Sequence, residues 1–382
     1  MIRSAAAVAG ALVLVALAGT GTRAAAGAVA SARQVRQPPV TAYVATSNPD
    51  SVVPVRLATG RILRPIPVHG PTLSIAVTRD GRTVVVVSYT GSNRSNVVLI
   101  HTATGKVFKT VRFTGFPVVP VVLSPDSKTA YIATSLGPDT VIPVQLRTGR
   151  LGRPIHVRRD PEAMAITPDG RTLYVAGDTS GTVTPIRTAT WKALRPIRVG
   201  QQPGAIAVTP DGRTAYVKSE TTGVVTPIRT ATNTPLRPVR IGNPGSYPDP
   251  QAIAIPPRGK TAYVLGGGRV IPIAISTRRA RKPIRIDPGA GSLVMSPDGA
   301  RLYAIDYLFG IITPINTATG KALREIHLRT LVGDVAVTPD SKTVYAGLKG
   351  GTLIPFATAT GKRGEAIRLP QQRLIDTLVI AP

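Results

Sequence analysis

Arginine, tyrosine and acidic residues in a few irregular segments are the residues of this chain most able to do chemistry. These segments separate regular, turn-punctuated sequence and differ in length and composition, which is typical of binding loops on a rigid scaffold. The candidate ligand contacts that we select are Arg158, Arg159, Glu162, Tyr247, Asp306, Tyr307, Asp334 and Asp376. Carboxylates among them could offer oxygen ligands to Ca²⁺ or Mg²⁺. No spacing typical of a metal site accompanies them, and we predict no metal and no cofactor.

The histidines and the lack of cysteine argue against common catalytic arrangements. The chain has 4 histidines and no cysteine, and none of the histidines is paired in sequence with a nucleophile or a metal-ligand pattern. We therefore expect a non-catalytic binding protein. The alternative is a hydrolase or lyase whose site is assembled from distant segments, which would need acids and bases within hydrogen-bond reach of one another.

One repeated unit must position these residues. Segment 165–199 closely resembles segment 207–241, and the units are rich in Val, Ile, Thr and Tyr with frequent Pro and Gly, which favours strands over helices. A Pro-Asp-Gly turn, or a close variant of it, marks seven units. Its aspartate, or in one unit Arg258, recurs every 40 to 47 residues, at Asp80, Asp126, Asp169, Asp211, Arg258, Asp298 and Asp340. Such a period is typical of propeller blades.

The two ends of the chain predict how the ring closes. Each unit reads as four strands, and the second strand of the unit occurs eight times, beginning at Thr41, Thr83, Thr129, Thr172, Thr214, Thr261, Arg301 and Thr343. The copy at Thr41 lacks a first strand before it, whereas the C-terminal segment 375–382 reads as a first strand with no second strand after it. We therefore predict a single all-β propeller of eight four-stranded blades, closed by the C-terminal strand joining the N-terminal blade. Seven blades are the alternative.

The motifs of this unit resemble a known repeat. TPDGRTLYVAG at 167–177 and INTATGKAL at 315–323 resemble the YVTN-type β-propeller repeat family, although no copy reads Tyr-Val-Thr-Asn. The resemblance covers residues 41 to 382. It implies a propeller similar to surface-layer and periplasmic propellers, and more distantly to lactonase-like propeller enzymes, which are the source of the hydrolase alternative.

Tyrosine divides into structural and candidate functional positions. Seven of the 10 tyrosines share one slot in the second strand, and we predict that they pack between blades: Tyr43, Tyr131, Tyr174, Tyr216, Tyr263, Tyr303 and Tyr345. Tyr89, Tyr247 and Tyr307 fall outside this slot. They lie in or beside the variable connections, which we expect to share one face of the propeller while the uniform Pro-Asp-Gly and Thr-Gly turns share the other.

Positive charge is the strongest compositional signal. The chain has 47 Lys and Arg against 19 Asp and Glu, a net charge of +28, which favours polyanionic partners. The outermost strand of the unit is of the Arg-Pro-Ile-Arg-Val type, and we predict a polyanion-binding rim made by Arg112, Arg198, Arg240, Arg285 and Arg368. We expect an anionic cell-envelope polymer or a protein as the partner. Nucleic acid ranks lower, because most aromatic residues occupy packing slots.

The first residues have the pattern of a secretory signal. A short basic start at Arg3 precedes an apolar run to about Ala18 and then small residues. We predict a signal peptide over 1–30, a disordered lead-in over 31–40 and the β-propeller over 41–382. The protein is accordingly expected to be secreted or associated with the cell envelope, monomeric, and without a membrane span after cleavage.

Overall fold

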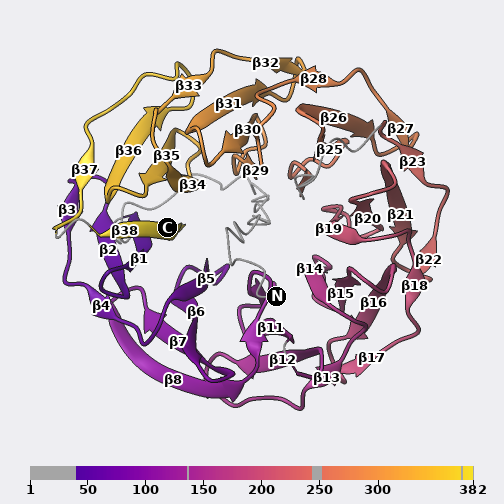
Figure 1. Ribbon diagram of the computed structural model, residues 1–382, viewed down its shortest axis with the longest axis horizontal. Helices are drawn as coiled ribbons and strands as arrows, with labels where there is room; N and C mark the ends of the chain where they lie inside the picture. Colours follow the sequence, from indigo (N-terminus) through magenta and orange to yellow (C-terminus); the bar gives the residue numbers. More distant parts are fainter. Residues whose placement is uncertain (1–39, 136, 243–251, 371–372, 382) are drawn as a thin grey trace, which may run out of the picture.

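The described residues form a closed ring of eight antiparallel sheets. The computed structural model describes residues 40–135, 137–242, 252–370 and 373–381, and each sheet forms one blade with its first strand nearest the centre (Figure 1). The prediction of an all-β, eight-bladed propeller is confirmed, and the seven-blade alternative is wrong. No α-helix occurs among these residues, and hence none long and apolar enough to cross a membrane.

The strands follow the chain blade by blade, and most outermost strands are in two pieces. From the centre outward, blade 1 contains β38 (Leu374–Ala381), β1 (Thr41–Ser47), β2 (Ser51–Arg56), β3 (Arg61–Ile62) and β4 (Ile66–Pro67), and blade 2 contains β5 (Thr72–Val77), β6 (Thr83–Gly91), β7 (Arg94–His101) and β8 (Lys106–Thr114). Blade 3 contains β10 (Val122–Leu123), β11 (Thr129–Ser135), β12 (Thr140–Gln145) and β13 (Ile155–His156), with β9 (Phe116–Pro117) beside β11. Blade 4 contains β14 (Pro161–Ile166), β15 (Thr172–Gly177), β16 (Thr182–Arg187), β17 (Lys192–Ala193) and β18 (Ile197–Arg198).

The second half of the chain repeats this order. Blade 5 contains β19 (Pro203–Val208), β20 (Thr214–Ser219), β21 (Val224–Arg229), β22 (Thr234–Pro235) and β23 (Val239–Arg240), and blade 6 contains β24 (Ile253–Ala254), β25 (Thr261–Gly266), β26 (Arg269–Ala274), β27 (Arg279–Ala280) and β28 (Ile284–Arg285). Blade 7 contains β29 (Ser292–Met295), β30 (Arg301–Asp306), β31 (Ile311–Asn316), β32 (Lys321–Ala322) and β33 (Ile326–His327). Blade 8 contains β34 (Val332–Val337), β35 (Thr343–Leu348), β36 (Thr352–Ala357) and β37 (Ile367–Arg368).

The ring closes as the chain ends predict. β38 pairs antiparallel with β1, with Leu378 opposite Val44, so the last strand supplies the inner edge of the first blade. Arg373, 6 % exposed, reinforces this closure from the segment before β38. Its guanidinium donates to the carbonyl of Pro49 at 3.3 Å and to the hydroxyl of Ser51, both at the β1–β2 turn.

The uniform turns lie together on one face. In blade 4, Thr167 Oγ1 donates to Asp169 Oδ1 at 2.5 Å, and the N–H of Arg171 donates to the same oxygen at 3.0 Å. Gly170 follows with φ 72°, a conformation that glycine adopts without a steric penalty. Thr188 Oγ1, from the turn between the third and fourth strands, donates to the carbonyl of Gly170 at 2.6 Å. This bond joins the two kinds of turn, as the sequence predicts.

The recurring tyrosines join neighbouring blades. All seven are at most 6 % exposed. Tyr43 Oη donates to the carbonyl of Thr102 in the next blade at 3.1 Å, and Tyr263 Oη does the same to Thr317 at 3.0 Å. Burial raises the pKa of Tyr43 to about 12, which keeps its hydroxyl protonated as a donor. The predicted role in blade packing is confirmed.

A proline in the third strand accounts for the break in the fourth. Pro185 lies opposite Tyr174, and its carbonyl accepts a hydrogen bond from Leu194 N at 2.8 Å. Proline has no N–H to return to the outer strand, so the ladder is interrupted there. Seven blades have a proline in this position, whereas blade 2 has Leu99 opposite Val85, and its outer strand β8 continues unbroken through 9 residues.

Candidate functional site

The outermost strands present a ring of arginines to solvent. Along β18 and the residue after it, Ile197 and Val199 are each 5 % exposed, whereas Arg198 between them is exposed. This alternation follows from the period of a strand, which points successive side chains to opposite sides. The five predicted rim residues all occupy such outer strands and all are exposed: Arg112 in β8, Arg198 in β18, Arg240 in β23, Arg285 in β28 and Arg368 in β37.

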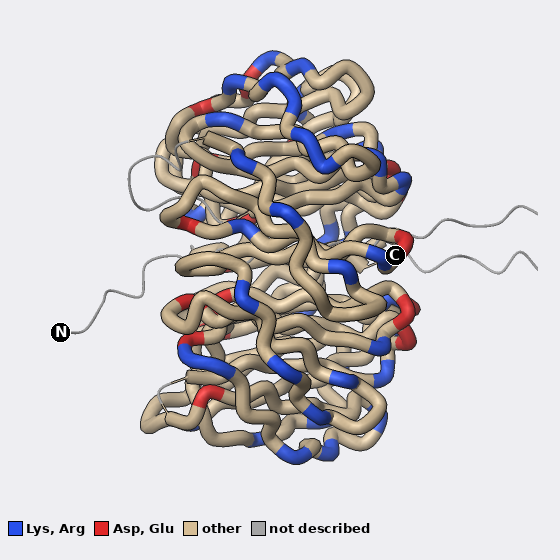
Figure 2. The backbone as a smooth tube through the Cα atoms, turned by 90° about the vertical axis from the view of Figure 1, so that its right-hand side faces the viewer, with Lys and Arg blue, Asp and Glu red and all other residues tan. Residues whose placement is uncertain are grey.

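A second basic ring, which the sequence analysis missed, lies beside the first. Seven blades carry an exposed basic residue two positions before the buried residue of the outer strand: Arg64, Lys109, Arg153, Arg195, Arg237, Lys282 and Arg324. The recurring Arg-Pro or Lys-Pro dipeptide is the sequence signal that could have revealed this ring. In the side view, basic residues run down the exposed edge of the propeller, while acidic residues lie mostly toward its two faces (Figure 2).

No residue of either basic ring forms an ion pair within the described ranges. Ion pairs there join Lys128 to Asp126, Arg171 to Asp169, His327 to Glu325 and Lys349 to Asp376. None of these pairs involves a residue of either basic ring. The two rings of exposed basic side chains, which together we call the cationic rim, therefore remain available to an external anion.

Some of the predicted ligand contacts gather where blades 7, 8 and 1 meet. Asp334 Oδ2 accepts hydrogen bonds from Thr377 Oγ1 at 2.7 Å and from Leu378 N at 3.0 Å, which tie β34 to β38. Burial raises the pKa of Asp334 to about 6, although these hydrogen bonds and Lys349 act in the opposite direction. Tyr307 Oη lies 2.7 Å from Ser292 Oγ, and burial together with the charge of Asp334 raises the pKa of Tyr307.

Asp376 belongs to the same region. Lys349 Nζ donates to Asp376 Oδ1 at 2.8 Å, and both side chains are partly exposed. The pKa of Asp50, from the β1–β2 turn, is raised by burial and by the charge of Asp376. Asp334, Asp376 and Tyr307 thus form a polar junction between blades, and the hydrogen bonds of Asp334 join blade 8 to the closing strand.

Asp306 lies inside a turn and does not project from the loop face. It is 1 % exposed, and its Oδ1 accepts hydrogen bonds from Leu308 N at 2.8 Å and from Phe309 N at 2.9 Å. Burial raises the pKa of the neighbouring Asp287, and its contact with Asp306 acts in the same direction. The turn thus holds Asp306 through Oδ1, while its buried Oδ2 has no hydrogen-bond partner among the described residues, and its role as a ligand contact stays a prediction.

The remaining predicted contacts lie elsewhere. Arg158 and Arg159 are exposed in the connection between β13 and β14, and Glu162 is exposed in β14, which lies across the ring from β38 (Figure 1). Tyr247 lies outside the described residues. The structure therefore does not bring the predicted contacts into one site. Among the residues it describes, no three His, Asp or Glu side chains are grouped as a metal centre would require.

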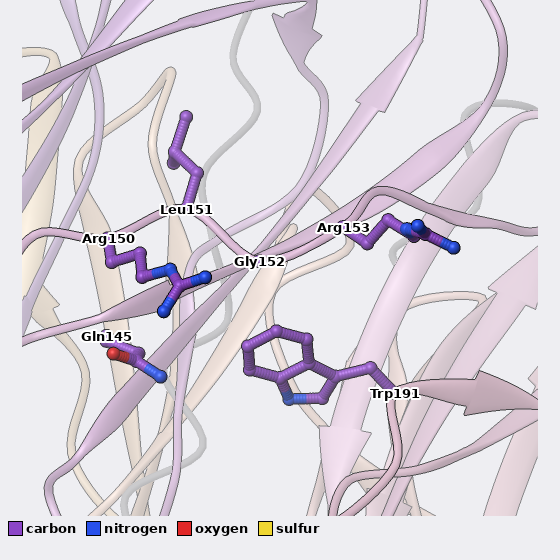
Figure 3. Close-up of a pocket in the computed structure, with 6 residues that line it drawn as sticks. All are labelled: Gln145, Arg150, Leu151, Gly152, Arg153 and Trp191. Carbon is purple, nitrogen blue, oxygen red and sulfur yellow. The ribbon is translucent and has the colours of Figure 1, made fainter.

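Two further departures from the repeat escaped the sequence analysis. Lys218 in β20 is 1 % exposed, although the same slot holds alanine in Tyr-Val-Ala-Gly at 174–177, and Glu220 close by is 9 % exposed. The second departure is the cleft between blades 3 and 4 shown in Figure 3, with a volume of about 490 Å³. It is lined by Gln145, Arg150, Leu151, Gly152, Arg153 and Trp191. A lysine in an apolar slot and a tryptophan in a glycine slot were the available signals.

Comparisons with known proteins support the architecture alone. No family model and no curated protein matches this chain. Among solved structures, dihydro-heme d1 dehydrogenase NirN in complex with DHE has a TM-score of 0.68 at 14% identity, over 88% of this chain and 73% of that one. A functionally unknown protein from Desulfotomaculum acetoxidans DSM 771 has a TM-score of 0.60 at 18% identity, over 89% of this chain and 98% of that one. Kuenenia stuttgartiensis hydrazine synthase has a TM-score of 0.53 at 24% identity, over 69% and 85%. These similarities show a shared propeller fold.

Proposed function

We propose that this protein is an exported propeller scaffold that holds anionic polymers of the cell envelope on its cationic rim. Export is supported by the signal-like sequence before residue 31, and a scaffold related to the YVTN-type propellers is supported by the Pro-Asp-Gly and Thr-Ala-Thr-Gly motifs. The scaffold acts as a monomer, because each blade already pairs with its neighbours and the ring is closed. Its partner is a polymer and not a small molecule, because the basic residues are spread around the circumference.

The unneutralised rim is the observation that carries this proposal. Proline and arginine on an outer strand also prevent edge-to-edge association, which lysine and glutamate together would do equally well. Protection of the edge therefore leaves the large excess of one charge unexplained. A polyanion lying along the rim would contact several guanidinium groups at once, and each neutralised contact would release counterions.

Charge reversal on the rim tests the proposal. We expect the combined change Arg198→Glu, Arg240→Glu and Arg285→Glu to weaken retention on immobilised polyphosphate and polygalacturonate by roughly tenfold or more at low salt, because ionic contacts are lost and repulsion replaces them. The three side chains are exposed on adjacent blades, so the fold is expected to persist. Affinity chromatography and circular dichroism of the purified protein measure the two effects.

A variant of equal charge provides the control. The change Arg171→Glu, Arg213→Glu and Lys342→Glu makes the same difference in net charge at exposed positions of the uniform-turn face. We expect it to weaken retention much less than reversal on the rim. Equal loss in the two variants would contradict a rim site in favour of net charge alone, and no retention of the unmodified protein at low salt would contradict polyanion binding altogether.

The hydrolase alternative gains less support from the geometry. An acid and a base do meet, since Lys349 and Asp376 form an ion pair. The oxygens of Asp334, whose raised pKa would suit a general base, are however occupied by Val335 N, Thr377 Oγ1 and Leu378 N. A carboxylate engaged in this way supports blade closure more than catalysis, and the binding scaffold remains the proposed function.

A further inference from the structure

Two matched departures from the repeat meet in the cleft between blades 3 and 4. Trp191 stands at the end of the turn before β17, where five other blades have glycine: Gly60, Gly105, Gly149, Gly320 and Gly361. Gly152 stands where Leu63, Leu194, Leu236 and Leu323 occupy the outer strand of other blades. The indole lies directly on Gly152, since a Cβ added there would come within 2.4 Å of Trp191 Cζ3. The small residue makes room for the large one across the blade boundary.

The backbone at this position does not favour tryptophan. Trp191 has φ 52°, in the left-handed region that glycine adopts freely and that disfavours a bulky side chain. The same turn forms with glycine at this position in five other blades. Trp191 is therefore present for its side chain, which is half-buried against the neighbouring blade and contributes to the wall of an open cleft.

Polar groups suited to an anionic ring surround the indole. Figure 3 shows the guanidinium of Arg150 extending toward the indole, with Gln145 beside it and Arg153 on the other side of Gly152. Arg150 and Arg153 are exposed, and neither has a carboxylate within ion-pair distance among the described residues. Gln145 Oε1 accepts a hydrogen bond from Thr148 Oγ1 at 3.1 Å, which leaves its amide N–H groups as donors.

We propose that this cleft binds one sugar ring of an anionic polysaccharide, such as a uronic acid residue. The electron-rich face of the indole suits the weakly positive C–H groups of a pyranose ring. The planar guanidinium of Arg150 suits a carboxylate, and the amide of Gln145 suits a hydroxyl. The inference rests on the proposed function, because it assigns to one point of the cationic rim the recognition of the polymer that the whole rim attracts.

The arrangement favours a saccharide over single-stranded nucleic acid. Nonspecific binding of a single strand uses several aromatic platforms for successive bases. The turn position of Trp191 is occupied by Gly149 in the preceding blade and by Asn233 in the following one. A single platform at the rim would hold one ring of a chain whose other charges contact neighbouring basic residues.

Trp191 is the only tryptophan of the chain, so its fluorescence reports directly on this cleft. We expect hexagalacturonate to cause a saturable change in emission at low salt. Maltohexaose, which has sugar rings without charge, and polyphosphate, which has charge without rings, are expected to cause none, although polyphosphate binds the rim. The same saturable change with polyphosphate, or no change with hexagalacturonate, would overturn the cleft proposal. A stronger change with oligothymidylate would overturn it in favour of base stacking.

Three variants distinguish binding in the cleft from binding along the rest of the rim. We expect Trp191→Gly, which restores the residue of other blades, and Arg150→Gln each to weaken hexagalacturonate binding in calorimetry roughly tenfold. Arg279→Gln, an equal charge change at the same slot of blade 6, is expected to have little effect. Polyphosphate binding should survive Trp191→Gly. If the variants bind both polymers like the unmodified protein, the cleft proposal is wrong and the rim proposal stands; if neither polymer binds the unmodified protein, both are wrong.

Discussion

At the scale of single residues, the repeat separates structural positions from departures. The tyrosine slot could be predicted from the sequence, because a residue that returns at one place in seven blades serves the packing common to all of them. The role of Asp306 could not, because its burial depends on how Leu308 and Phe309 fold back over its carboxylate. The contact of Trp191 with Gly152 could not be predicted from the sequence either, since it depends on how two neighbouring blades are placed against each other.

Asp334 makes stability depend on pH. Its pKa is about 6 in the folded protein, above the ordinary value of 3.8, so the folded state favours the protonated form. The free energy of unfolding is therefore expected to fall as pH rises from about 4 to about 6, and this contribution of Asp334 is least favourable above its folded pKa. Asp334→Asn cannot ionise, and we expect it to remove about 3 kcal/mol of this pH dependence in denaturant titrations.

A second measurement checks that the raised pKa belongs to Asp334. The side-chain carboxyl resonance of Asp334 should titrate with a midpoint near its folded pKa of about 6. Identical pH dependence of the unfolding free energy in Asp334→Asn and the unmodified protein would contradict a desolvated carboxyl at this position.

At the scale of elements, turns and chain ends were more informative than the outer strands. The Pro-Asp-Gly turns and the unmatched strands at the two ends predicted eight blades and the β38–β1 pairing. The break in the fourth strand was not predicted, because it depends on a proline in the third strand whose effect appears only when register is known. The second basic ring lies beside that break, and its signal, the recurring Arg-Pro or Lys-Pro dipeptide, was present in the sequence.

The closing segment should be sensitive to Arg373. This buried side chain donates to Pro49 O and Ser51 Oγ, and Arg373→Ala removes both hydrogen bonds together with the packing of the buried side chain. We expect a loss of about 2 kcal/mol in the free energy of unfolding, with the largest rise in hydrogen exchange in β1 and β38. Arg368→Ala, an exposed arginine in β37, is the matched control and should change stability by less than about 0.5 kcal/mol. Equal effects of the two substitutions would contradict a special role for Arg373 in closure.

At the scale of the whole molecule, the closed ring of blades provides the surface around which the positive charge is distributed. A closed ring of sheets keeps a cysteine-free chain together, while a net charge of +28 is tolerated because basic residues are distributed around the circumference. Composition shows the excess charge, and a polyanionic partner stays a prediction from it. The exposure of both rings, and the absence of ion pairs to them among the described residues, could be established only from the structure.

The most direct test of a polyanion-binding rim is the dependence of affinity on salt. The dissociation constant for polyphosphate, measured by calorimetry at several salt concentrations, should rise steeply, with a logarithmic slope of about 3 or more if several rim residues release counterions together. Reversal of Arg198, Arg240 and Arg285 should lower that slope. An affinity that is independent of salt, or a slope that the reversal leaves unchanged, would contradict the cationic rim as the binding surface.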